Sequence, residues 1–180
     1  AVDGVIDALE HRTWAFLSVT STQFRIGLPK DGIPNRESTE DIYFERLIKA
    51  DFVFRERIGY RNELYIIGGG HCALALSELM SRMDFYIRLF DDRPELNTLQ
   101  KNRFAHEIRI IERYEQIGEL ISPGSNAYVV VMTLGYTSDE IVIRSLIGNE
   151  FKYFGVLGSK AKMAILLKTL ENEGFPAEEL

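Results

Sequence analysis

The chain has 180 residues, of which 46% are hydrophobic, so it can bury a core of ordinary size and is not globally disordered. Its formal net charge of −6 argues against a surface for nucleic acid or anionic membrane, because both need clustered lysine and arginine. A single cysteine excludes an internal disulfide, and no apolar run is long enough to span a bilayer, so we expect a cytoplasmic protein.

The first 60 residues are predicted to form a small, separate α+β region. Residues 14–26 are rich in β-forming side chains, and residues 52–58 alternate apolar and polar side chains like a half-buried strand. Between them, residues 27–39 gather glycine, proline and asparagine as in a loop, and residues 40–49 space their apolar side chains as a helix does.

Residues 61–180 are predicted to form a second domain, because strand and helix patterns alternate along them. The expected strands are 64–67, 85–90, 108–111, 127–132 and 152–157, and the expected helices are 71–83, 95–105, 114–121, 138–148 and 160–173. This alternation predicts an α/β fold: a doubly wound, mostly parallel, Rossmann-like sheet with helices on both faces. Such a sheet binds its ligands at the carboxyl ends of its strands.

A glycine-rich turn follows the first of these strands. Residues 68–73 read GGGHCA and fit the pattern G-x-G-x-x-A, with Gly68 allowing a tight turn and Gly70 allowing a ligand to approach the backbone. Asp91 lies 21 residues after Gly70, near the offset at which an acid reaches a ribose hydroxyl. The combination predicts a nucleotide-shaped site, and the alternative is a tight turn without a ligand.

Two unusual side chains stand at the start of the helix after this turn. His71 has no role in a simple dinucleotide turn, so we predict that it contacts a ligand or binds a metal, with an exposed surface histidine as the alternative. Cys72 is predicted to be a small buried packing residue, although a thiolate in a first helical turn would be stabilised there.

The segment after residues 127–132 offers further candidates. Thr133 presents a hydroxyl at the end of the strand, and Gly135 keeps the turn open. Thr137 and Glu140 fit the T-x-x-E pattern of a capping box. Asp139 is equally well explained as a ligand contact or as an acid that stabilises the first turn of a helix.

Two more strand ends carry charge. Residues 158–160 read Gly-Ser-Lys, with Ser159 as an expected N-cap, and resemble an anion-binding corner. Lys162 either adds to that corner or is simply solvated. Arg93 either binds a phosphate or neutralises its acidic neighbours, of which Asp92 is the nearer.

Four segments in this order and spacing resemble the C-terminal Rossmann-like domain of the XdhC/CoxI family: GGGHCALAL, LFDDRPE, VVVMTLGYTSD and YFGVLGSKAKM. The resemblance covers residues 63–180. It implies an accessory factor for xanthine dehydrogenase and related molybdenum hydroxylases. Members of this family bind molybdenum cofactor, help it to acquire its terminal sulfur and pass it to the apo-enzyme.

The resemblance also implies a set of cofactor-binding residues, which are Gly68, Gly70, His71, Asp91, Asp92, Arg93, Thr133, Gly135, Asp139, Gly158, Ser159 and Lys160. The glycines and the 158–159 corner would hold phosphate, the two aspartates would orient the pterin or nucleotide, and the histidine and threonine would line the reactive side. No catalytic residue and no metal ligand is assigned. Leu134 and Tyr136 stand where family members often carry a second histidine.

The sequence therefore predicts a cytoplasmic, non-redox factor that binds molybdopterin and assists sulfuration and insertion of the cofactor. Its expected partners are an apo-molybdenum hydroxylase, a cysteine desulfurase and a second copy of the chain. The alternatives are an NAD(P)-binding oxidoreductase and a nucleotide-sensing regulatory module. Two histidines, His11 and His106, lie outside the glycine turn, and neither provides an evident catalytic pair for the oxidoreductase.

Overall fold

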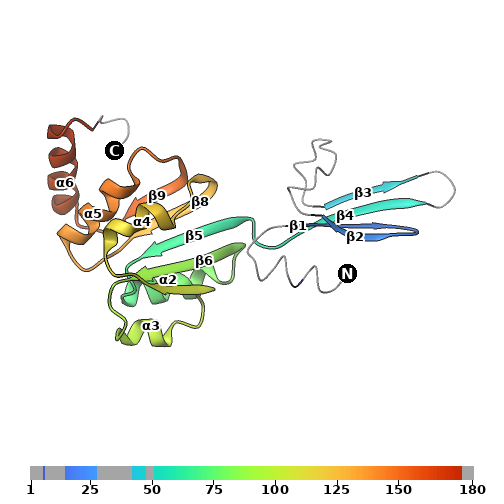
Figure 1. Ribbon diagram of the computed structural model, residues 1–180, viewed down its shortest axis with the longest axis horizontal. Helices are drawn as coiled ribbons and strands as arrows, with labels where there is room; N and C mark the ends of the chain where they lie inside the picture. Colours follow the sequence, from blue (N-terminus) through green and yellow to red (C-terminus); the bar gives the residue numbers. More distant parts are fainter. Residues whose placement is uncertain (1–5, 7–14, 28–41, 48–50, 176–180) are drawn as a thin grey trace. The chain divides into compact units, whose positions relative to one another are not determined.

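The computed structural model describes residues 6, 15–27, 42–47 and 51–175. The chain divides into two compact units, Ala1–Arg61 and Asn62–Leu180 (Figure 1). Each unit has its own sheet. Within the described residues, no helix is both long and apolar enough to cross a bilayer.

The first unit contains an antiparallel sheet in the order β2-β1-β4-β3. Its strands are β1 (Ala15–Thr20), β2 (Phe24–Gly27), β3 (Ile42–Arg46) and β4 (Phe52–Ile58). The strand predicted for residues 52–58 is confirmed, and the β-rich stretch before Gly27 forms a hairpin. The loop predicted over residues 27–39 lies, after Gly27, outside the described residues.

The helical spacing expected for residues 40–49 is wrong where the structure describes it. Residues Ile42–Arg46 form β3, which pairs with β4 and places Phe44 opposite Phe54. The physical reason is that Ile42 and Phe44 also repeat with a period of two, and aromatic cross-strand packing decides between the two periods.

The second unit is a five-stranded sheet in the order β7-β6-β5-β8-β9, and every neighbouring pair is parallel. The strands are β5 (Asn62–Ile67), β6 (Phe85–Asp91), β7 (Glu107–Ile110), β8 (Gly124–Val131) and β9 (Phe151–Val156). The helices are α2 (His71–Met80), α3 (Asn97–Lys101), the 3₁₀ turn η3 (Tyr114–Gln116), α4 (Ile117–Leu120), α5 (Tyr136–Leu146) and α6 (Lys160–Asn172). The predicted doubly wound α/β sheet is confirmed.

Alternation along β5 shows how the two faces of this sheet are covered. Leu64 and Ile66 pack in the core shared with α2 and α3, whereas Tyr65 and Ile67 pack in the opposite core with α4 and α5. Successive side chains of a strand point to opposite faces, so a continuous apolar run is what a sheet covered on both sides requires. In Figure 1, α2 and α3 accordingly lie on one side of the sheet and α4 and α5 on the other.

The order of the strands also locates the ligand-binding edge. From β5 the chain adds β6 and β7 on one side of the sheet and then β8 and β9 on the other. The direction of winding therefore changes between β5 and β8. In open α/β sheets, ligands bind outside the carboxyl ends of the strands at this switch point.

Candidate functional site

A hollow of about 740 Å³ lies at the carboxyl ends of the strands. It is lined by Gly70, His71, Cys72, Leu74, Arg93, Leu96, Asn97, Thr98, Lys101, Met132, Thr133, Leu134 and Leu157. Among the described residues the lining includes two cations and a histidine but no carboxylate, although the chain as a whole carries a net charge of −6. The hollow therefore favours an anionic ligand.

The glycine turn between β5 and α2 forms one wall of the hollow. Gly68 has φ +105°, and a Cβ there would lie 2.8 Å from the Cα of Thr133 and still closer to the carbonyl oxygen of Met132. Gly70 is different, because a Cβ there would meet no atom within 4 Å. The packing of the chain itself thus requires glycine at 68 but leaves the space in front of Gly70 open.

The start of α2 faces this open space. Its N-cap is Gly70, which makes no side-chain cap, and the first turn has no acidic residue. Free N–H groups at a helix start, with the partial positive charge of the helix dipole, bind anions. His71 and Cys72 are both exposed and both line the hollow. The prediction that Cys72 is a buried packing residue is wrong, because Ala73 faces the sheet in its place.

Asp91 ends β6 behind the glycine turn and is fully buried. Its Oδ2 accepts hydrogen bonds from Gly69 N at 2.6 Å and from Arg93 Nη2 at 2.7 Å. Its Oδ1 accepts from the backbone N and the Nε of Arg93, both at 2.9 Å. We call this arrangement the Asp91 clamp. Burial alone would raise the pKa of Asp91, but the hydrogen bonds from Arg93 and Gly69 outweigh it and hold the pKa below its usual value.

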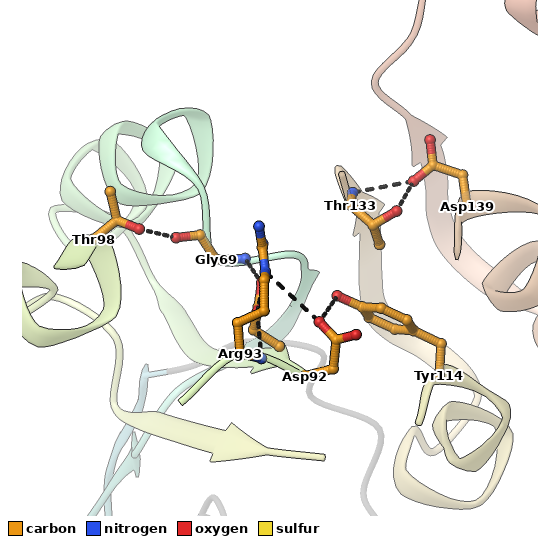
Figure 2. A network of polar contacts seen from close by, with 8 residues as sticks. Gly69, Asp92, Arg93, Thr98, Tyr114, Thr133 and Asp139 are labelled. Carbon is orange, nitrogen blue, oxygen red and sulfur yellow. Dashed lines mark hydrogen bonds and ion pairs between the residues drawn. The ribbon is translucent and has the colours of Figure 1, made fainter. Parts of the chain in front are cut away.

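Two neighbours complete this region (Figure 2). Asp92 is exposed and accepts a hydrogen bond from the Tyr114 hydroxyl at 3.1 Å. Burial, together with the charges of both aspartates, raises the pKa of Tyr114, so its hydroxyl keeps its proton and donates. On the other side, Thr98 donates to the carbonyl oxygen of Gly69 and so joins α3 to the turn.

Asp139 forms a second arrangement of the same kind on the β8 side. It lies in the first turn of α5 and is fully buried. Its Oδ1 accepts from Thr133 N at 3.1 Å and from the Thr133 hydroxyl, and its Oδ2 pairs with Lys162 Nζ. We call this arrangement the Asp139 clamp. Asp139 is an acid in the first turn of a helix, as one of its two explanations expected. In addition, its carboxylate holds the loop after β8 and binds a lysine from α6.

The capping box expected at Thr137 and Glu140 is not formed. The helix begins at Tyr136, two residues earlier than expected, with Gly135 as N-cap at φ +118° and no side-chain cap. Glu140 instead pairs with Arg144 one turn later, at 2.7 Å. A glycine that tolerates positive φ therefore starts α5 without the help of a side chain.

The corner after β9 is a capped helix start. Ser159 Oγ accepts a hydrogen bond from Lys162 N at 3.2 Å, as its predicted N-cap role requires. Lys162 is not a free surface cation, because its ammonium group also lies 3.3 Å from the carbonyl oxygen of Gly135. Gly158, Ser159 and Lys160 are exposed.

Four of the twelve candidate residues line the hollow: Gly70, His71, Arg93 and Thr133. Gly68, Asp91 and Asp139 lie behind its wall, where they shape the loops. The other five are outside the lining, and they are Asp92, Gly135, Gly158, Ser159 and Lys160.

Sequence reasoning missed several lining residues. Asn97 and Lys101 come from α3, which has only five residues and was expected to be longer. Leu134 and Leu157 line the mouth and are 79% and 53% exposed. Leu157 directly follows β9 and Leu134 is the third residue after β8, so the place of each leucine after a strand was the available signal.

Two comparisons with known proteins match this domain. The family model described as the XdhC Rossmann domain matches residues 64–180. A crystal structure described as a xanthine dehydrogenase from Bacillus halodurans superposes with a TM-score of 0.64 and 22% sequence identity. That likeness covers 97% of this chain but 54% of the other, so the chain spans about half its length, and at this identity it shows the fold alone. No curated protein matches the chain.

Proposed function

This chain belongs to the XdhC family, and on that premise we propose that it is an accessory factor that binds molybdenum cofactor and assists its sulfuration and insertion into a xanthine dehydrogenase-type molybdenum hydroxylase. One observation carries the proposal. Among the described residues, the hollow at the switch point is lined by two cations, Arg93 and Lys101, and by no carboxylate, in an acidic protein, which suits a phosphorylated cofactor.

The residues present fit such a cofactor. The space in front of Gly70 is large enough for a Cβ and more, and it adjoins the uncapped start of α2. The phosphate of a molybdopterin would be held there by backbone N–H groups and by Arg93. The apolar side chains Met132, Leu134 and Leu157 offer a surface for a flat ring at the other end of the hollow.

The remaining groups orient the ligand. Thr133 donates its hydroxyl proton to Asp139, so the lone pairs of its oxygen remain available to a donor on the ring. His71 at the rim can donate or accept a hydrogen bond. The bound cofactor supplies the molybdenum centre whose terminal sulfur the client enzyme needs. The described residues contain no cluster of three metal-ligating side chains, so in this proposal the protein holds the organic part of the cofactor.

The proposed partners follow from the same role. The client is an apo-molybdenum hydroxylase, and a cysteine desulfurase provides the sulfur. The exposed Leu134 and Leu157 at the mouth give a partner an apolar edge to contact beside the ligand. We place this work in the cytoplasm, and a second copy of the chain remains a proposed partner.

The test is anaerobic co-expression with an apo-hydroxylase in a host that makes the cofactor, followed by metal analysis and pterin fluorescence of the purified chain. We expect bound molybdenum and pterin, and loss of both in Gly70→Val, which fills the space in front of α2. Ala75→Val on the exposed face of the same helix is the matched control and should stay loaded. An empty wild-type chain, or a fully loaded Gly70→Val chain, would contradict the proposal.

A second candidate is an NAD(P)-binding protein, either an oxidoreductase or a sensor. It is favoured by the strand order and by the glycine turn at the start of α2, which dinucleotide-binding domains share. A chain that purifies without pterin, binds NAD(H) and turns over a substrate would establish the oxidoreductase. Binding without turnover would establish the sensor.

A further inference from the structure

The carboxylate at the end of β6 has no hydrogen-bonding capacity left. A carboxylate offers about four lone-pair positions, and Asp91 accepts four N–H groups, from Gly69 N and from the N, Nε and Nη2 of Arg93. In a Rossmann domain that binds NAD, the acid at this position accepts hydrogen bonds from the ribose hydroxyls. Asp91 could do so only by releasing a partner that it now holds in a fully buried place.

Arg93 holds this carboxylate and keeps donors to spare. Its side chain is 35% exposed and lines the hollow. Two of its five side-chain N–H groups go to Asp91, and no described residue accepts a hydrogen bond from Nη1. The guanidinium stays charged, and its planar fork matches phosphate oxygens.

A second cation lines the same hollow. Lys101 is exposed at the end of α3, and Asn97 begins that helix. Asp92 Oδ1 lies 3.7 Å from Arg93 Nε, but Asp92 accepts a hydrogen bond from Tyr114 and does not line the hollow. On the β6 side, the described lining thus offers the donors of two cationic side chains and no carboxylate to accept from a diol.

We propose that the β6 side of the hollow selects a phosphate monoester, with Arg93 as the specificity-determining residue and Lys101 as the second cation, and that it rejects a ribose diol. The inference rests on the proposed function only in placing a phosphorylated ligand in this hollow. For molybdenum cofactor it means the form that ends in a phosphate monoester. The nucleotide-extended form, whose two phosphates are joined as a pyrophosphate and whose ribose is a diol, is rejected.

The first test uses NADP⁺ and NAD⁺ as probes, because they differ by one phosphate monoester on the ribose. Isothermal titration of the full chain should show NADP⁺ binding about tenfold tighter or more, the effect of a single charge-assisted contact. Lys101→Gln should reduce the affinity for NADP⁺ several-fold and leave that for NAD⁺ unchanged. Lys168→Gln on the exposed side of α6 removes the same charge away from the hollow and should change neither.

Arg93→Lys tests the specificity-determining residue itself. This variant keeps the positive charge but loses the planar guanidinium fork, so the ratio of the Kd for NAD⁺ to the Kd for NADP⁺ should fall towards one. If this variant does not fold, as judged by circular dichroism, Lys101→Gln decides the question. Equal or tighter binding of NAD⁺, no binding of either nucleotide, or a preference that survives the folded variants would overturn the proposal.

A second measurement identifies the phosphate-bearing ligand that the chain binds when it is co-expressed with its client. Pterin released from the co-expressed chain should carry a phosphate monoester and no nucleotide. A nucleotide-extended pterin would overturn this inference and leave the accessory role intact. A chain that prefers NADP⁺ but purifies without pterin would instead overturn the accessory role and leave this inference standing.

Discussion

The Asp91 clamp and the Asp139 clamp lie on either side of the switch point and use the same chemistry. Each is a fully buried carboxylate that accepts a backbone N–H from a loop and pairs with a cation. They differ in where the cation comes from. Arg93 is two residues away from Asp91, whereas Lys162 reaches Asp139 from α6, 23 residues on.

This difference separates two tasks. The Asp91 clamp is local, and its cation still faces the hollow, so it shapes the glycine turn and presents a charge to the ligand. The Asp139 clamp joins two strand–helix units, and its cation, Lys162, binds Asp139 and the carbonyl oxygen of Gly135. We therefore expect the Asp139 clamp to matter more for stability and the Asp91 clamp to matter more for binding.

The largest expected effect comes from breaking the Asp139 clamp. Asp139→Ala leaves Lys162 without its buried partner and Thr133 N without its acceptor, and should lower the free energy of unfolding by about 3–5 kcal/mol. Urea unfolding measures this. Lys162→Met and the double variant complete a cycle, in which the double variant should be more stable than the sum of the single losses predicts. A loss below about 1 kcal/mol would show that the clamp is not structural.

Breaking the Asp91 clamp should cost less. In Asp91→Ala, Gly69 N loses its acceptor, but Arg93 can turn to solvent, so we expect a loss of about 1–3 kcal/mol. Because the pKa of Asp91 is lowered in the folded chain, its stabilising contribution is present above the unfolded value of 3.8 and is lost as the pH falls through the folded pKa. In acid unfolding, Asp91→Ala should lack the part of the stability loss that comes from protonation of Asp91. If Asp91→Ala lowered the free energy of unfolding as much as Asp139→Ala, the proposed difference between the two clamps would be contradicted.

The glycine turn between the clamps gives a paired prediction of similar size. Gly68→Ala should cost about 1–3 kcal/mol, because of its positive φ and the backbone of residues 132–133. Gly70→Ala should cost only the weaker N-cap preference of alanine, roughly 0.5–1 kcal/mol. Thermal unfolding of both variants checks the order, and equal losses would contradict the open space in front of Gly70.

The cap of α6 tests whether the Asp139 clamp depends on the helix that supplies its lysine. Ser159→Ala removes the side-chain acceptor of Lys162 N and should cost about 1 kcal/mol. If the cap also positions Lys162, the loss should shrink when Lys162→Met is already present. Full additivity of the two losses in urea unfolding would show that cap and clamp are independent.

The smallest effect is a dependence on pH away from both clamps. His106 Nδ1 accepts a hydrogen bond from Ile87 N at 2.9 Å, and burial lowers the pKa of His106. A lowered folded pKa means that the unfolded chain binds more protons, so stability should decline as the pH falls below about 6.5. His106→Asn should flatten the decline, whereas both clamp variants should keep it.

The sequence was a good guide to what depends on neighbours along the chain. The strands of the second unit, their parallel pairing, the glycine turn and the N-cap at Ser159 all follow from local spacing and from the rules of α/β connection. Asp91 was found for the same reason, since its offset from Gly70 is part of a known pattern.

What the sequence could not predict depends on distant pairs. The bond between Asp139 and Lys162 exists only because α5 and α6 begin beside each other. From the sequence, Asp139 was explained as a ligand contact or a first-turn acid, and Lys162 as part of an anion-binding corner or a solvated charge. Cys72 was expected to be a small buried packing residue, but the rotation of α2 assigns that place to Ala73. Likewise, the sequence could not show that Arg93 occupies the acceptor positions of Asp91, because this depends on how the two side chains are oriented.

The tight contact of Gly68 with residues 132–133 bears on when the site forms during folding. The turn follows β5, but the backbone against which it packs arrives more than sixty residues later, after β8 has paired with β5. Closing so long a loop is slow compared with forming a helix or a neighbouring β–α–β unit. A chain emerging from the ribosome can therefore assemble β5, α2 and β6 early. The glycine turn, however, acquires its final shape only when residue 133 is in place.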